Sequence, residues 1–136
     1  MFPELAKYTT NGHFVFHVTD RLSDVCNAPA DKSGVYLVYG IRKNKPELLY
    51  VGISGGRGAN GKILPRKGGI RDRILNSRQF GDRRKVSWPA KMKEQEIDAL
   101  DIYWYITWDT LIKDCPRELE VLLLKKHREL TGRLPE

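Results

Sequence analysis

Residues 33–54 read SGVYLVYGIRKNKPELLYVGIS, and this stretch decides the fold. It contains two apolar runs rich in Val, Leu, Ile and Tyr, at 35–41 and 48–53, separated by a polar segment of Lys, Asn and Pro. Runs of this length and composition, with turn residues between them, are typical of paired strands. The stretch therefore predicts an antiparallel hairpin.

Alternation along the first run indicates which side chains share a face. The residues at 35, 37 and 39 fall on one side of the strand, and Tyr36 falls on the other. Tyr36 comes just after Gly34, and Tyr50 comes just before Gly52. A glycine within a strand often marks a place where another backbone or a ligand comes close. The hairpin is therefore expected to present two phenol groups to one place.

The composition favours a polyanionic partner. The 136 residues include 24 Lys and Arg against 17 Asp and Glu, a formal charge of +7. A basic surface attracts nucleic acid, and no apolar run is long enough to span a membrane, so DNA is the expected partner and no membrane is. Cys26 and Cys115 fit no metal-ligand spacing, and no signal peptide is evident, so a reduced intracellular, cytoplasmic location is expected.

A third strand is expected at residues 101–108, DIYWYITW, where Ile and Trp alternate with Tyr and Thr. This strand would complete a sheet with the hairpin, its tryptophan face buried under helices. Ahead of the hairpin, residues 13–18 predict another strand, and 20–26 predict a short helix capped by Thr19 or Asp20. The expected fold class is α/β, more narrowly α+β. It consists of a small three-stranded antiparallel sheet flanked by helices in residues 33–136, with an N-terminal extension, residues 1–32, packed on it.

Basic segments follow the hairpin. Residues 54–69 are glycine-rich and basic, and they lack the Gly-Lys-Ser/Thr ending of a P-loop, so a nucleotide site is not expected. Because the segment is basic, it is expected to follow a phosphate backbone, with an ordinary surface loop as the alternative. A helix is expected from near Gly69, with Arg73 at the margin of its buried face. Residues 78–93 predict a connection and then a short helix capped by Ser87, with Pro89 in its first turn. The residues expected to contact nucleic acid are Arg57, Lys62, Arg66, Lys67, Arg71 and Arg78.

The last predicted helix begins near Pro116 and carries two candidate metal ligands. Glu118 and Glu120 flank its leucine face, and neither has Lys or Arg three or four residues ahead. Glu120 has apolar neighbours on the helix surface, a setting in which a carboxylate is expected to bind a cation. A single hard carboxylate suits one Mg²⁺ that keeps most of its waters.

The two tripeptides Gly34-Val35-Tyr36 and Tyr50-Val51-Gly52 resemble the paired signature of the GIY-YIG nucleases, which lies on neighbouring strands. The resemblance extends from Gly34 to about the end of the chain and implies a GIY-YIG endonuclease-like domain that hydrolyses DNA. Three features depart from the family pattern. The tyrosines are further apart, the insertion before the arginine is longer, and the chain stops at residues 134–136, LPE, without the family's asparagine after a proline.

The resemblance also implies a role for each candidate residue. Residues 70–74, IRDRI, are similar to the family's Leu-x-x-Arg context and imply that Arg73 contacts the scissile phosphate, with Arg71 as the alternative. Residues 120–124, EVLLL, are similar to the context of the family's metal ligand, so Glu120 would hold Mg²⁺ or Mn²⁺. Tyr36 would take or orient the proton of the attacking water, with Tyr50 in support.

These residues together predict a metal-dependent endonuclease that cleaves DNA by in-line attack of water. One alternative is a nucleic-acid-binding module that keeps the fold without the chemistry, and another is a protein-interaction domain whose basic surface is incidental. The sequence contains no zinc-ligand pattern and no helix-turn-helix signature. Any sequence specificity is therefore expected from the basic loops, a homodimer or an accessory DNA-binding partner.

Overall fold

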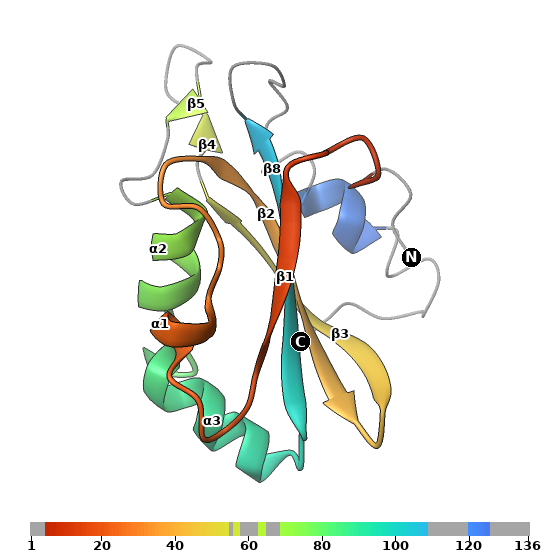
Figure 1. Cartoon of the computed structure of the whole chain (residues 1–136), viewed down its shortest axis with the longest axis vertical. Helices are drawn as coiled ribbons and strands as arrows, with labels where there is room; N and C mark the ends of the chain where they lie inside the picture. The colour runs from red at the N-terminus through yellow and green to blue at the C-terminus, as the bar shows by residue number, and fades with distance from the viewer. Residues whose placement is uncertain (1–4, 55, 58–62, 65–68, 109–119, 126–136) are drawn as a thin grey trace.

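The computed structural model describes residues 5–54, 56–57, 63–64, 69–108 and 120–125. Its centre is an antiparallel sheet of four strands in the order β1-β8-β2-β3 (Figure 1). The strands are β1 (Asn11–Phe16), β2 (Ser33–Arg42), β3 (Lys45–Ser54) and β8 (Ala99–Trp108). The expected hairpin and third strand are therefore confirmed, whereas the expected count of three strands is wrong. The N-terminal strand is a fourth member of the same sheet, because β1 pairs with β8 over its whole length.

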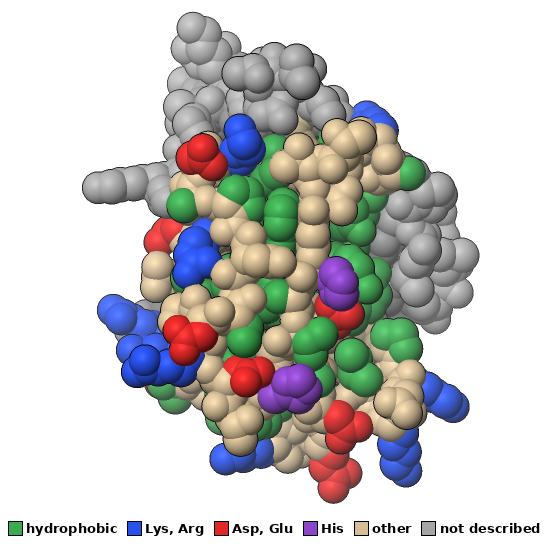
Figure 2. Space-filling model, in the orientation of Figure 1, with side chains coloured by type: hydrophobic (Ala, Val, Ile, Leu, Met, Phe, Trp, Pro, Cys, Tyr) green, Lys and Arg blue, Asp and Glu red, His purple; other side chains and the backbone are tan. Residues whose placement is uncertain are grey.

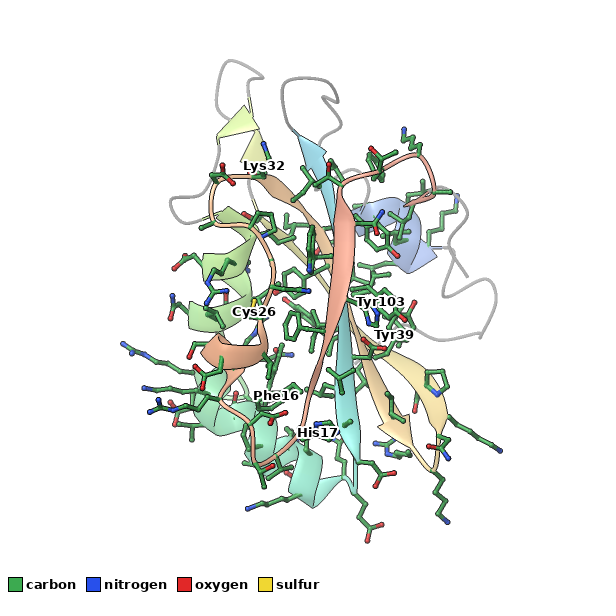
Figure 3. The ribbon with its side chains drawn as sticks, viewed as in Figure 1. Phe16, His17, Cys26, Lys32, Tyr39 and Tyr103 are labelled. Atoms are coloured by element: carbon green, nitrogen blue, oxygen red, sulfur yellow. The ribbon has the colours of Figure 1, made fainter. Side chains whose placement is uncertain are left out.

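Helices cover both faces of the sheet (Figure 1). One face packs under α1 (Leu22–Val25), α2 (Gly69–Asn76) and α3 (Arg84–Glu94), in a core that includes Tyr36, Ile102 and Trp104. The other face carries a second cluster with Val35 and Leu37, onto which the helical segment 120–125 packs through Leu123. The alternation expected along β2 and the burial of the tryptophan face of β8 are both confirmed. Figure 3 places Phe16 on the α1 side and Tyr39 and Tyr103 on the opposite side.

The hairpin turn is shorter than the sequence pattern indicates. Lys43 and Asn44 alone connect β2 to β3, with φ angles of 50° and 66°, the geometry of a two-residue type I′ turn. The polar residues on either side belong to the strands, which are 10 residues long each. The register shifts between Val38 and Tyr39, so that Leu49 is an extra residue on β3. The additional residues between the two tyrosines therefore lengthen the strands rather than the loop.

Two helix starts differ from those expected. The residue before α1 is Arg21, which makes no side-chain cap, and Asp20 instead accepts a hydrogen bond of 2.8 Å from the backbone N–H of His17. Helix α3 begins at Arg84 rather than at Ser87, and Pro89 lies inside it. Four residues of α3 are buried against the core, which offsets the hydrogen bond that Pro89 cannot donate. The expected helix near Gly69 is confirmed as α2.

Short paired strands occupy the basic connections. In the first, β4 (Gly56–Arg57) pairs with β5 (Ile63–Leu64) inside a segment expected to be an irregular loop. In the second, β6 (Arg78–Gln79) and β7 (Asp82–Arg83) form a tiny hairpin between α2 and α3. No helix within the described ranges is long and apolar enough to cross a membrane.

Candidate active site

Strands β2 and β3 bring Tyr36 and Tyr50 together on the face covered by α2 and α3. Tyr36 pairs with Gly52 and the neighbouring Val38 pairs with Tyr50, so the two tyrosines are diagonal neighbours. Their ring centres are 6.0 Å apart, with the rings tilted by 46°. Tyr36 is fully buried and Tyr50 is half-buried. The expectation that two phenols meet at one place is confirmed.

The two glycines of the tripeptides are required by close approach. A Cβ atom at Gly52 would collide with the ring of Tyr36, which lies directly over that part of the β3 backbone. A Cβ atom at Gly34 would collide with the backbone oxygen of Tyr105 on β8. A side chain at either position would therefore displace Tyr36 or separate β2 from β8.

Arg84 connects this tyrosine pair to the helices. Its side chain is 1% exposed, and its guanidinium carbon lies 5.3 Å from the ring centres of both Tyr36 and Tyr50 and 4.8 Å from that of Trp88. The Nη1 group donates hydrogen bonds to the backbone oxygens of Arg73, at 3.0 Å, and Ile74, at 3.2 Å. Arg84 thus satisfies carbonyls at the end of α2 and makes cation–π contacts with three rings.

Arg73 projects from α2 beside the same ring. Its Nε is buried and makes no hydrogen bond within the described structure, and its positive charge acts on Tyr36. The Nε of Arg84 and the hydroxyl of Tyr36 are also buried without a hydrogen-bond partner there. Buried polar groups are normally paired, so three unsatisfied donors at one place are typical of a site that awaits a polar ligand. The two permanent positive charges of Arg73 and Arg84 are chemically suited to an anion.

Burial raises the pKa of Tyr36 to about 12. The positive charge of Arg84 acts against burial, and the proximity of Tyr50 adds to it. A hydrogen-bond interaction with the side chain of Arg84 and the charge of Arg73 each lower the pKa by a smaller amount. The cations next to Tyr36 therefore favour its phenolate, as expected from the basic composition, but burial has the larger effect. The phenol is protonated at neutral pH and is a hydrogen-bond donor.

Arg71, the alternative to Arg73, has its guanidinium engaged elsewhere. Its Nη1 donates to the backbone oxygen of Cys26 at 2.6 Å, and its Nη2 donates to that of Ser23 at 3.0 Å. These bonds satisfy carbonyls at the end of α1, so Arg71 has a structural role in which it connects α2 to α1. Of the other residues expected to contact nucleic acid, Arg57 and Arg78 have only their backbones described, and Lys62, Arg66 and Lys67 lie outside the described residues.

Glu120 lies on the helical segment that covers the other face of the sheet. It is half-buried, and Leu123, one turn further on, belongs to the cluster with Val35 and Leu37. The tyrosines, Arg73 and Arg84 belong to the face under α2 and α3 (Figure 1). Within the described residues, no group of three His, Cys, Asp or Glu side chains could hold a metal ion. The described residues therefore do not fit a metal centre beside the tyrosines, and Glu118 lies outside them.

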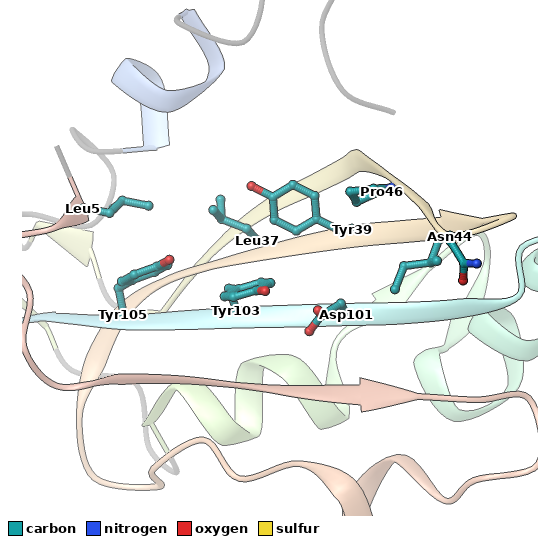
Figure 4. Close-up of a pocket in the computed structure, with 9 residues that line it drawn as sticks. Leu5, Leu37, Tyr39, Asn44, Pro46, Asp101, Tyr103 and Tyr105 are labelled. Carbon is teal, nitrogen blue, oxygen red and sulfur yellow. The ribbon is translucent and has the colours of Figure 1, made fainter. Parts of the chain in front are cut away.

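The second face contains a cavity of about 480 Å³ (Figure 4). Tyr39, Tyr103 and Tyr105 line it together with Asp101. His13 stacks on Tyr103 with ring centres 4.7 Å apart, and its Nδ1 lies 2.9 Å from a carboxylate oxygen of Asp101. Among the described residues, those that line this cavity include a carboxylate and neither Lys nor Arg, which is unlike a phosphate site.

Arg84 is the site residue that sequence reasoning missed. The sequence shows it inside the run Arg83-Arg84-Lys85, of which the first and last residues are exposed. The one available signal was its spacing from Trp88, since residues four apart on a helix are neighbours. Pro89 concealed that signal because it suggested that the helix begins later.

A scan against protein-family models, a search of curated proteins and a search of solved structures each found no match for this chain. The resemblance to the GIY-YIG nucleases therefore depends on the two tripeptides and on the residues gathered around them.

Proposed function

We propose that this protein is a metal-dependent endonuclease that hydrolyses DNA phosphodiester bonds, with the cluster of Tyr36, Tyr50, Arg73 and Arg84 as its phosphate site. One observation supports it above the others: the hydroxyl of Tyr36 and the Nε groups of Arg73 and Arg84 are buried together, and none of them makes a hydrogen bond of good geometry within the described structure, although Arg84 is close enough to the hydroxyl to lower its pKa. A phosphodiester supplies the acceptors that these donors lack. The chain's formal charge of +7 draws such a polyanion to the protein.

In the proposed reaction, a water oxygen forms a bond to phosphorus as the bond from phosphorus to the 3′ oxygen breaks. The proton that the attacking water loses passes to solvent, and solvent supplies the proton that the departing 3′ oxygen gains, so that one water is consumed. Arg73 binds the non-bridging oxygens and stabilises the extra negative charge of the transition state. Because Tyr36 is protonated at neutral pH, it orients the attacking water or the phosphate by donating a hydrogen bond, and it does not remove the proton.

The metal remains a prediction based on the resemblance. Glu120 would hold Mg²⁺ or Mn²⁺ with waters completing the coordination, and its helix lies on the opposite face of the sheet from the proposed phosphate site. Since the described helix around Glu120 packs on the other face of the sheet, no step of the proposed reaction is assigned to the ion.

The first experiment is cleavage of supercoiled plasmid and branched DNA with Mg²⁺, with Mn²⁺ and with chelator. Tyr36→Phe and Arg73→Ala are each expected to lower the cleavage rate by about 10²–10³-fold. Lys45→Ala, an exposed position at the far end of the hairpin, is the control and is expected to have no effect. Absence of cleavage by the intact protein on both substrates would rule out the endonuclease. Salt-sensitive binding alone would then favour the binding module.

Glu120→Ala tests the metal separately. Loss of metal-dependent cleavage with DNA binding retained would assign the ion to Glu120. Unchanged cleavage would assign the ion to another carboxylate, with Glu118 tested next.

The tyrosine-lined cavity favours a second candidate function, recognition of a protein partner. Phenol rings around the carboxylate of Asp101 suit a basic side chain, which gains cation–π contacts and an ion pair there. Binding of an arginine-containing peptide that Asp101→Asn abolishes would support this function. If Asp101→Asn left the affinity unchanged, the cavity would have no such role.

A further inference from the structure

Phe80 occupies a conformation that a large side chain rarely adopts. It lies between β6 and β7 with a φ of 57°, and Gly81 follows with a φ of 86°. A two-residue turn with positive φ at both positions is a type I′ turn, for which Asn-Gly is the preferred sequence. The side chain of Phe80 is nevertheless 55% exposed. The turn therefore holds an aromatic ring in solvent in a backbone conformation that is unfavourable for Phe, and conformations of this kind are enriched at functional sites.

The ring of Phe80 lies beside the proposed phosphate site. Phe80 lines a small apolar cavity together with Tyr50 and Trp88. Trp88 in turn donates a hydrogen bond of 2.9 Å to the side chain of Gln79, the residue before Phe80. The tiny hairpin is thereby attached to the aromatic residues that surround Arg84.

Positive charge accompanies the exposed ring. The Nζ atom of Lys91 lies 4.9 Å from the ring centre of Phe80. Arg83 and Lys85 are exposed next to the turn, and Figure 2 shows Lys and Arg side chains gathered on the left of the molecule, around α1 and the start of α3. Figure 2 also shows Asp and Glu side chains among them; Asp82 and Glu94 line the same hollow as Phe80, and Glu94 lies 3.5 Å from Lys91. An aromatic ring beside an ammonium group matches a nucleotide, which has a flat base and a phosphate.

We propose that Phe80 stacks on an unpaired base of the nucleic acid held at the Tyr36–Arg73 site, while Lys91 contacts the phosphate of that nucleotide. This inference rests on the proposed function and specifies its substrate class. Bases inside a duplex are already stacked on their neighbours, so the ring selects nucleic acid with an unpaired base at a branch, a nick or a single-stranded segment. The competing explanation is that Phe80 covers the small cavity and stabilises the fold.

The variant Phe80→Asn separates the two explanations, because it creates the preferred Asn-Gly turn and removes the ring. We expect its affinity for a single-stranded oligonucleotide to fall by about tenfold, in the range known for one stacked base, and its Tm to stay the same or rise. Phe80→Trp is expected to keep the affinity. Val86→Asn, at an apolar position 51% exposed on α3, is the matched control and is expected to keep it too.

The readout is the fluorescence of an oligonucleotide that contains 2-aminopurine, which stacking quenches, measured at one salt concentration alongside a thermal melt. Equal affinity of Phe80→Asn and the intact protein would overturn the inference. So would a Tm that falls together with the affinity, because the ring would then be structural. Stacking without plasmid cleavage would count against the endonuclease alone, and cleavage without stacking would count against the role of Phe80 alone. Absence of oligonucleotide binding by the intact protein would overturn the inference outright.

Discussion

The hydroxyl of Tyr36 is buried next to two arginines and makes no hydrogen bond within the described residues. Leaving a buried polar group unpaired costs stability, so its removal is close to neutral for the fold. We expect Tyr36→Phe to change the free energy of unfolding by less than about 1 kcal/mol at neutral pH, while it lowers DNA cleavage. Urea unfolding and plasmid nicking on the same preparation check this. A loss of stability well beyond that range would mean that the hydroxyl has a structural role.

The same tyrosine affects stability at alkaline pH. Its folded-state pKa of about 12 lies above the ordinary value of about 10, so the unfolded chain releases this proton first and stability falls between about pH 10 and 12. Below pH 10 the stability that is linked to the protonated Tyr36 side chain is fully retained. Tyr36→Phe is expected to lose less stability across this interval than the intact protein.

Tyr39 offers a matched control, because burial also raises its pKa to about 12 although it lies on the opposite face of the sheet. Tyr39→Phe is therefore expected to reduce the alkaline loss similarly and to leave cleavage unchanged. An identical alkaline profile for Tyr36→Phe and the intact protein would contradict the assignment.

Individual site residues differed in how far the sequence predicted them. The meeting of Tyr36 and Tyr50 follows from the two-residue period of strands, which is local information. The place of Arg73 also follows, because helical periodicity puts it at the margin of the buried face. Arg84 is different, since its burial depends on the end of α2 and on two rings from the hairpin, which no local pattern in the sequence encodes.

Among the elements, the hairpin turn offers the clearest test of local geometry. Lys43 and Asn44 both have positive φ, which favours Asn and Gly at these two positions. The double variant Lys43→Asn, Asn44→Gly is expected to stabilise the protein by about 1 kcal/mol, because Asn and Gly adopt positive φ with less strain than Lys and Asn do at these two positions. The hydrogen bond from the backbone N–H of residue 43 to Asp98 does not depend on the side chain and is retained.

Urea unfolding of this double variant provides the measurement, with Lys45→Asn on the adjoining strand as the control that should bring no gain. A double variant less stable than the intact protein would show that the turn is not of this type.

The ends of the elements were predicted less well than the elements themselves. The turn residues Lys, Asn and Pro suggested a long loop. Pairing nevertheless continues to Arg42 and Lys45, in a register that the bulge at Leu49 shifts by one residue. In α3, the tertiary packing of Arg84, Trp88 and Met92 outweighs the tendency of Pro89 to begin a helix.

In the complete fold, the N-terminal strand β1 covers one side of the long strand β8. Phe14 and Phe16 on β1 are buried in the core under the helices, and burial of side chains of this size is worth about 2 kcal/mol each. Deletion of residues 1–19 removes both and leaves β8 as an open edge. We expect the shortened protein to aggregate, as measured by size-exclusion chromatography and dye binding to exposed apolar surface. A soluble, cooperatively unfolding monomer would contradict this expectation.

The sequence could predict the sheet, yet it could not predict the face on which each later helix packs. The leucines of residues 120–125 indicate that the segment is amphipathic, and nothing in that periodicity distinguishes the two faces of a sheet. The place of Glu120 relative to the tyrosines is for this reason the part of the candidate site that the sequence determined least.

Strand β2 is hydrogen-bonded on both sides, to β8 and to β3, and it carries Tyr36. Amide protons in such a strand exchange with solvent mainly when the entire domain opens, since no smaller opening breaks both ladders. Tyr36 therefore lies on a strand that stays paired when only the termini or the loops of the protein open locally. Under the proposed function, β2 would therefore hold Tyr36 at one position for every substrate that the site binds.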